Sequence, residues 1–278
     1  MQETMKVKSY DELEFRDDFM FGKVMQDREL CHDVLECLLQ RPVGELKDIQ
    51  PQREIRYTVD GKPIRLDIYT RDDNAVYDAE MQKLNKKSIA SLELPRRTRF
   101  YQASIDMDHM NKSQSYRTLP DSTILFICTF DPFGKGLCKY TFRGRCEEDP
   151  EIAIDDGAER IFYNCCYGGE DIPEELRKLY DYIETGKSSS NLTERIDNAV
   201  EEAKKIEEWR TGYMKEIVLF MDAKEEGREE GREEEKNNTE IERKRADEAE
   251  RRADTAEKRA NTAESELSRY KAAFGELA

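Results

Sequence analysis

Two carboxylates and one amide occupy alternate positions in two short segments that have the pattern of neighbouring strands. Asp67 lies in segment 64–69, and Glu80 and Gln82 lie in segment 77–82, and in both segments apolar and polar residues alternate. Alternation with a period of two buries one face of a strand and leaves the other face polar. We therefore expect Asp67, Glu80 and Gln82 to stand together on the polar face of a hairpin.

The residues between the two segments set the register of this hairpin. Asp73 and Asn74 tolerate positive φ, which a two-residue hairpin loop needs. With these two residues as the loop, Asp67 faces Glu80 across the strands. The same register pairs Arg65 with Gln82 and Tyr69 with Asp78 on the polar face.

Opposed carboxylates repel each other, so this pair calls for a chemical explanation. A hard divalent cation such as Mg²⁺ takes one or two carboxylates together with water and substrate phosphate, and it would offset the repulsion. The spacing therefore indicates a Mg²⁺ site directed at a phosphodiester. The alternatives are a solvated polar face, or a pair separated by a one-residue difference in register.

Basic residues follow the second strand closely and form the densest basic patch near the acidic pair. They are Lys83, Lys86, Lys87, Arg96, Arg97 and Arg99. Positive side chains of this kind contact DNA phosphates, so the patch is the candidate DNA-binding surface. Its alternative role is a solvated helix face.

Several short sequence motifs resemble those of a known family. They are Asp18-Phe19-Met20-Phe21, Arg65-Leu66-Asp67-Ile68-Tyr69, Tyr77-Asp78-Ala79-Glu80-Met81-Gln82, Arg97-Thr98-Arg99-Phe100-Tyr101-Gln102 and Ile127-Cys128-Thr129-Phe130-Asp131-Pro132-Phe133-Gly134. Together, from about residue 15 to about residue 220, they resemble the Rpn family of recombination-promoting nucleases and putative transposases, within the PD-(D/E)XK nuclease superfamily. Gln82 stands where the superfamily motif has lysine.

The resemblance implies a fold, a metal and a set of roles. The fold would be α/β, a restriction-endonuclease-like mixed sheet flanked by helices. Asp67, Glu80 and the backbone carbonyl of Met81 would hold Mg²⁺, for which Mn²⁺ may substitute, and Gln82 would position the attacking water. Asp18 would join the metal shell from the first helix, although its other reading is a helix N-cap.

Glutamine forms hydrogen bonds but carries no charge, so the charge of the motif lysine must come from elsewhere. Arg65, Arg97 and Arg99 are the candidates. Lys83 is a poor substitute because the next residue on a strand points to the opposite face.

The surrounding pattern predicts the elements that position these residues. We expect helices at 14–25, 27–39, 95–112 and 173–184, and strands at 46–59, 122–130, 137–143 and 159–165, with a hairpin turn at Asp60-Gly61. Segment 122–130 is continuously apolar, which is typical of a strand buried on both faces. Strands of this kind between helices predict an α/β sandwich.

Four parts follow from composition. Residues 1–13 are expected to be a flexible N-terminus, 14–190 the nuclease-like domain, 191–223 an amphipathic helical segment and 224–278 a charged helix or coiled coil.

A heptad seam marks the last part. Apolar residues recur three and four positions apart at Ala246, Ala249, Ala253, Ala256, Ala260, Ala263, Leu267, Tyr270, Phe274 and Leu277. This spacing favours a homo-oligomer held by a coiled coil. The alternative is a lone charged helix stabilised by ion pairs along its own surface.

Charge and cysteine usage bound the function. The chain is 39% charged, with a net charge of −9 in residues 1–192 and −7 in residues 193–278. An acidic domain cannot hold DNA strongly by charge alone, so a local basic patch, a metal or an oligomer must do so.

No apolar run approaches the roughly 20 residues of a membrane span, and the first residues do not have the form of a signal peptide. Seven cysteines without zinc-site spacing indicate reduced thiols in a cytoplasmic protein.

The leading hypothesis is a Mg²⁺-dependent DNA endonuclease that hydrolyses phosphodiester bonds and is linked to recombination or mobile elements. Two alternatives stay open. One is a catalytically weak or inactive nuclease-fold module that works in assembly through its coiled coil, and the other is a defence or toxin-type nuclease.

Overall fold

A computed structural model describes residues 7–56, 64–83 and 90–275. The chain divides into two compact units, Met1–Tyr213 and Met214–Ala278. The predicted hairpin turn at Asp60-Gly61 lies outside the described residues.

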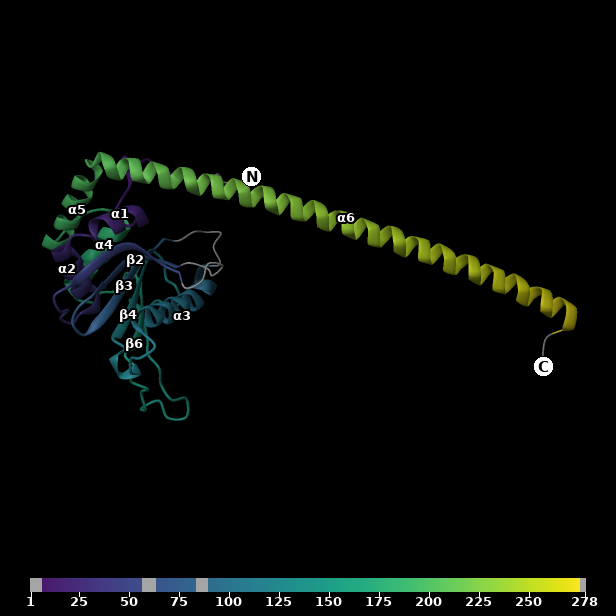
Figure 1. Cartoon of the computed structure of the whole chain (residues 1–278), viewed down its shortest axis with the longest axis horizontal. Helices are drawn as coiled ribbons and strands as arrows, with labels where there is room; N and C mark the ends of the chain where they lie inside the picture. The colour runs from purple at the N-terminus through teal and green to yellow at the C-terminus, as the bar shows by residue number, and fades with distance from the viewer. Residues whose placement is uncertain (1–6, 57–63, 84–89, 276–278) are drawn as a thin grey trace. The chain divides into compact units, whose positions relative to one another are not determined.

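The first unit is built on a mixed open sheet, which has six strands within the described residues (Figure 1). In chain order they are β1 (Lys47–Ile55), β2 (Ile64–Arg71), β3 (Ala75–Gln82), β4 (Asp121–Cys128), β5 (Lys139–Phe142) and β6 (Ala158–Asn164). Their spatial order is β1-β2-β3-β4-β6-β5. The pairs β3–β4 and β4–β6 are parallel, and the other three pairs are antiparallel.

Helices cover both faces of this sheet. One layer contains α1 (Asp18–Val24), α2 (Arg28–Leu39), α4 (Glu174–Thr185) and α5 (Asn191–Lys204), and the opposite face carries α3 (Ala90–His109) (Figure 1). Two aromatic contacts mark the faces: the Tyr163 hydroxyl on β6 donates to the Leu38 carbonyl of α2, whereas Tyr101 of α3 stacks on Phe126 of β4. The predicted α/β class is confirmed.

Strand β4 lies in the middle of the sheet, and its side chains from Ser122 to Cys128 are all buried. The prediction from its continuous apolar run is therefore confirmed. The remaining predicted helices and strands of the first unit are also present, with ends shifted by a few residues. The largest shift is in α3, which begins at Ala90 rather than 95 and continues through Pro95. Pro95 has no N–H to donate to the carbonyl four residues before it, so the start of α3 lacks that hydrogen bond.

The first unit extends beyond the expected domain 14–190 on both sides, because distant segments pack together. The short 3₁₀ turn Tyr10–Glu12, within the expected flexible N-terminus, buries Tyr10, and the Tyr10 hydroxyl donates to the Ala203 carbonyl at 2.7 Å. Helix α5 lies in segment 191–223, which was expected to be helical and amphipathic, and it buries Ile196, Val200 and Ala203. The compact unit therefore extends to Tyr213, whose ring packs on those of Tyr10 and Phe19.

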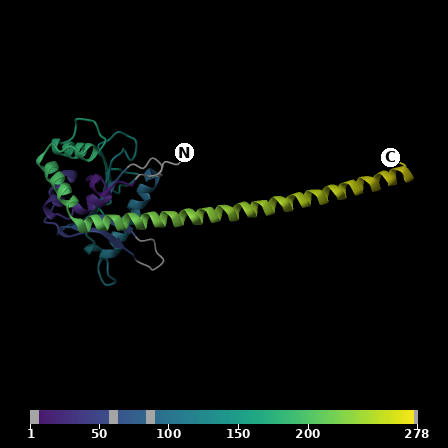
Figure 2. The ribbon, with the colours of Figure 1, turned by 90° about the horizontal axis from the view of Figure 1, so that it is seen from above.

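Helix α6 (Glu207–Phe274) crosses from the first unit into the second, and Figure 2 draws it as one uninterrupted helix. It continues through Gly227 and Gly231, although glycine weakens a helix. From Val218 to Ala273 every residue is exposed. None of the described helices is both long and apolar enough to cross a lipid bilayer.

Candidate active site

The β2–β3 hairpin has the predicted register. Its ladder pairs Ile68 with Ala79, Tyr69 with Asp78, Thr70 with Tyr77 and Arg71 with Val76. The Asp72 amide donates to the Ala75 carbonyl at 3.0 Å, which leaves Asp73 and Asn74 as the two-residue loop.

The expected reason for this loop was wrong, because neither Asp73 nor Asn74 has positive φ. The Asp72 carboxylate stabilises the turn instead. It accepts hydrogen bonds from the backbone amides of Asn74 at 2.7 Å and Ala75 at 2.8 Å, and also from the Gly44 amide and the Tyr77 hydroxyl. An aspartate that bonds backbone two residues onward forms a turn without left-handed residues.

Beyond Ile68 and Ala79 the two strands part, and the two carboxylates lie at that opening. The Asp67 amide donates to Glu80 Oε1 at 2.8 Å, and the Met81 amide donates to Asp67 Oδ2 at 3.1 Å. Each carboxylate is thus held by a backbone amide of the opposite strand. Asp67 and Glu80 are brought together from positions 13 apart in the chain.

The face that carries these groups is buried, because α3 packs over it. Glu80 is 4% exposed, Asp78 is completely buried and Asp67 is half-buried. Burial raises the pKa of Asp67, and the negative charges of Glu80 and Asp18 raise it further. The pKa of Glu80 is raised by burial and by Asp78. A solvated polar face is therefore not what the fold provides.

Asp78 is a member of this acidic group that the sequence reasoning did not select. Its side chain is hydrogen-bonded to that of Glu80, and burial followed by the charge of Asp67 raises its pKa. Two carboxyl groups buried side by side are costly, so the presence of Asp78 beside Glu80 points to a functional requirement. The available signal was its position two residues before Glu80, on the same face of β3.

Arg97, on α3, brings a positive charge to Gln82. Its Nη2 donates to Gln82 Oε1 at 2.7 Å and lies 3.9 Å from Glu80 Oε2. Its guanidinium also stacks over Phe126, 4.8 Å from the ring centroid. The Gln82 Nε2 donates to the Lys83 carbonyl at 3.2 Å, so both ends of the amide are oriented.

The other two arginine candidates are placed differently. Arg65 is exposed on β2, and its charge opposes the upward pKa shifts of Asp67 and Asp18. Arg99 is exposed on α3, two residues from Arg97 and so about 200° around the helix from it. Arg97 is therefore the arginine of α3 that contacts the candidate site, and Arg65 acts on the site through its charge.

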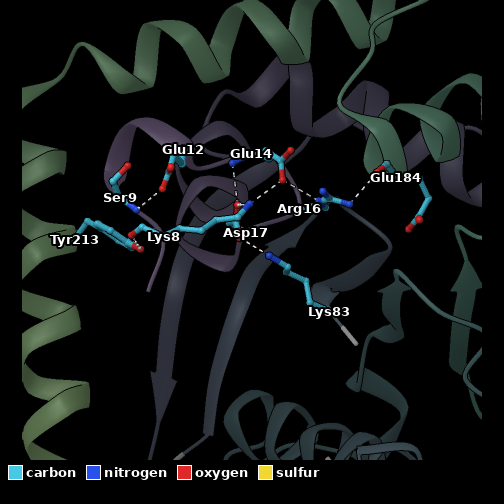
Figure 3. Close-up of polar contacts among 9 residues, drawn as sticks. All are labelled: Lys8, Ser9, Glu12, Glu14, Arg16, Asp17, Lys83, Glu184 and Tyr213. Carbon is cyan, nitrogen blue, oxygen red and sulfur yellow. Dashed lines mark hydrogen bonds and ion pairs between the residues drawn. The ribbon is translucent and has the colours of Figure 1, made fainter. Parts of the chain in front are cut away.

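Asp17 and Asp18 at the start of α1 take different roles, and Figure 3 shows the contacts of Asp17. Asp17 occupies the N-cap position without capping the helix, and its carboxylate binds the Glu14 amide, Lys8 and Lys83 instead. Asp18 begins the helix, and desolvation by surrounding protein raises its pKa. The N-cap reading of Asp18 was wrong, and its charge acts on Asp67.

The predicted basic patch is divided by the fold. Lys83 pairs with Asp17 (Figure 3), and its charge also acts on Asp18. Arg96 and Arg99 are exposed on α3. Lys86 and Lys87 lie outside the described residues.

The donor groups suit a hard cation in their chemistry. Asp67 and Glu80 each use one carboxylate oxygen for a backbone amide, which leaves a second oxygen on each, and Met81 adds a carbonyl. Oxygen donors of this kind are those that Mg²⁺ prefers. A cation would also offset the repulsion that raises both pKa values. Within the described residues, no group of three or more His, Cys, Asp or Glu side chains is arranged to hold a metal ion.

Comparisons with protein-family models, curated proteins and solved structures gave no match to this chain. The first unit is described as an α/β protein with a mixed open sheet, and any assignment beyond that rests on its own residues.

Proposed function

We propose that this chain is a metal-dependent DNA endonuclease with a PD-(D/E)XK fold, of the Rpn type that its sequence words resemble. The observation that carries the proposal is the pair Asp67 and Glu80 at the opening of β2 and β3, with Arg97 bound to Gln82 beside them. Perturbed, buried carboxylates that converge on one place are characteristic of functional sites.

In this proposal each residue has one role. Asp67, Glu80 and the Met81 carbonyl hold Mg²⁺, or Mn²⁺ in its place, and Asp18 supports them from α1. The bound ion lowers the pKa of water and offsets charge on the scissile phosphate. Gln82 orients the attacking water through its amide, which Arg97 holds in place. Arg97 also supplies the positive charge that the motif lysine would bring.

DNA is held locally rather than by the whole surface. The first unit is acidic, so general attraction to phosphates is weak. Arg96 and Arg99 are exposed on the helix that carries Arg97, and they are the proposed phosphate contacts. The seven cysteines are all unpaired, which supports a reducing, cytoplasmic location.

Two observations favour a second candidate function. The described residues hold no ready three-ligand metal cluster, and Gln82 replaces the motif lysine. A nuclease-fold module with little activity, acting in assembly through α6, would have these features. An active nuclease could serve recombination, mobile elements or defence, since the same fold supports each.

The test is cleavage of supercoiled plasmid DNA with Mg²⁺, Mn²⁺ or EDTA. We expect metal-dependent nicking by the wild type, and its loss in Asp67→Ala and in Glu80→Ala. Asp73→Ala is the matched control, because it removes an exposed carboxylate from the loop of the same hairpin. A folded wild type that is inactive with every metal would favour the assembly module instead.

A further inference from the structure

The seam on α6 is exposed along its length. Within the described residues, the seam positions run from Ala246 to Tyr270, and each is exposed, with Leu267 at 57% and Tyr270 at 67%. The sequence continues the same spacing at Phe274 and Leu277. A regular apolar stripe that its own chain leaves uncovered is suited to another helix with the same repeat.

The residues that flank the seam show which helix this is. With Ala246, Ala253, Ala260 and Leu267 as the a positions, the two flanking positions of the heptad, g and e, are all charged across four successive steps. The g positions are Arg245, Arg252, Arg259 and Glu266, and the e positions that follow them are Glu250, Glu257, Glu264 and Lys271.

In two parallel helices in register, each g residue lies beside the next e residue of the partner. All four pairs then join opposite charges: Arg245 with Glu250, Arg252 with Glu257, Arg259 with Glu264 and Glu266 with Lys271. In the last pair the g residue is acidic and the e residue is basic, the reverse of the first three pairs. Because both residues change sign together, the pair still joins opposite charges, as two copies of one helix require.

An antiparallel pair lacks this match, because g then faces g and e faces e. In the antiparallel register the outer pairs, Arg245 with Glu266 and Glu250 with Lys271, still join opposite charges, but at the centre Arg252 faces Arg259 of the other copy and Glu257 faces Glu264. These like charges disfavour the antiparallel arrangement.

We propose that residues 246–277 bind a second copy of this chain as a parallel, in-register coiled coil. The ion pairs that Arg245 and Arg252 form within their own helix are compatible with this pairing. Arg245 bonds Glu242 at 2.9 Å and Arg252 bonds Glu248 at 2.5 Å, both within the exposed helix. Exposed pairs of this kind contribute little and can be exchanged.

The same heptad frame limits where the pairing begins. Upstream, the a and d positions are polar or charged: Glu225, Arg228, Arg232, Glu235, Thr239 and Glu242. In register, Arg232 would face Arg232 and Glu225 would face Glu225 across the axis, so tight pairing cannot extend there. The larger side chains at and after Leu267 make the C-terminal end the tightest part of the pairing.

The experiment is sedimentation equilibrium of the full chain at low salt, and its outcome does not depend on the proposed nuclease activity. We expect a species of twice the 32.6 kDa chain mass. Glu257→Arg/Glu264→Arg turns two attractive pairs on each side of a parallel coil into repulsive ones. It should raise the dissociation constant on the order of a hundredfold. In an antiparallel coil the same change merely replaces one like-charge pair by another.

Two further variants complete the design. Asp247→Arg/Asp254→Arg makes the same charge change at outward b positions and should leave the dissociation constant within about threefold of wild type. Arg252→Glu/Arg259→Glu should self-associate poorly but pair with Glu257→Arg/Glu264→Arg on mixing, which separates charge repulsion from misfolding. A monomeric wild type at about 100 µM, a larger assembly, or an unchanged constant for Glu257→Arg/Glu264→Arg would each overturn the proposal.

Discussion

The charge beside Gln82 comes from another element of the fold. Gln82 ends β3, whereas Arg97 reaches it from α3 and is held there by the Gln82 oxygen and the Phe126 ring. A guanidinium that stacks on an aromatic ring is fixed in position more firmly than a lysine ammonium would be. Arg97 thus supplies the positive charge that the motif lysine would bring, and the Gln82 amide does not have to supply it.

Replacement of Arg97 tests this reading. We expect Arg97→Ala to lower the rate of metal-dependent plasmid nicking by about 10²-fold, because the site loses a preorganised positive charge. Arg97→Lys should recover part of the rate. Lys112→Ala, which removes an exposed positive charge after α3, should change the rate less than about twofold. Equal losses for the Arg97→Ala and Lys112→Ala variants would show that only general charge matters.

The Glu80 carboxylate is expected to lower the free energy of unfolding while it serves cleavage. It is buried beside Asp67 and Asp78, and repulsion within this group is unfavourable. In Glu80→Gln the side-chain oxygen still accepts the Asp67 amide proton, and the new NH₂ group can donate to Asp78. We expect the free energy of unfolding in EDTA to rise by about 1–2 kcal/mol while cleavage is lost.

Urea denaturation measures this change. Glu54→Gln, at an exposed position on β1, is the control and should stay within about 0.5 kcal/mol of wild type. A Glu80→Gln variant that is less stable than wild type would show that the carboxylate supports the fold rather than chemistry.

At the scale of the element, the hairpin loop depends on one carboxylate. Burial alone would raise the pKa of Asp72, but hydrogen bonds from Asn74, Ala75, Gly44 and Tyr77 outweigh it, and the pKa lies below its usual value. The hairpin therefore places Asp67 opposite Glu80 with the help of a side chain directly before the loop.

The depressed pKa gives this contribution a pH dependence. An acid with a lowered folded-state pKa stabilises the fold above its unfolded value near 3.9, and this contribution is lost as the pH falls through the folded value. We expect Asp72→Asn to cost about 1–3 kcal/mol at pH 7, and the difference from wild type to shrink below about pH 4. Urea denaturation across pH measures both, with Asp73→Asn as the control. A cost that does not change with pH would contradict the charge-based account.

At the scale of the whole molecule, the end of the first unit can be tested by truncation. Helix α5 buries Ile196 and Val200 against that unit, and each such side chain contributes about 1.5–3 kcal/mol. A chain ending at Ser190 should melt at least about 10 °C below a chain ending at Glu216. The chain ending at Glu216 should melt close to the full chain, because residues from Val218 to Ala273 are exposed. Circular dichroism against temperature gives the answer, and equal melting of both truncated chains would place the boundary at 190 after all.

Local patterns of residues were enough to predict the elements and the hairpin register. Period-two alternation shows which residues share a face, and a two-residue loop leaves a single way to pair the strands that follow it. These are local constraints, so Asp67 could be placed opposite Glu80 from segments only 13 positions apart. The heptad spacing of residues 246–277 is local in the same sense.

The surroundings of these residues depend on packing between elements, which local patterns do not reveal. The burial of Asp78 under α3, the choice of Arg97 over Arg99, the capture of Lys83 by Asp17 and the packing of Tyr10 on α5 are contacts between separate elements. The Tyr10 hydroxyl meets a carbonyl 193 positions away in the chain. Contacts of this kind depend on how helices are laid across the sheet, and no periodicity within a single segment records that arrangement.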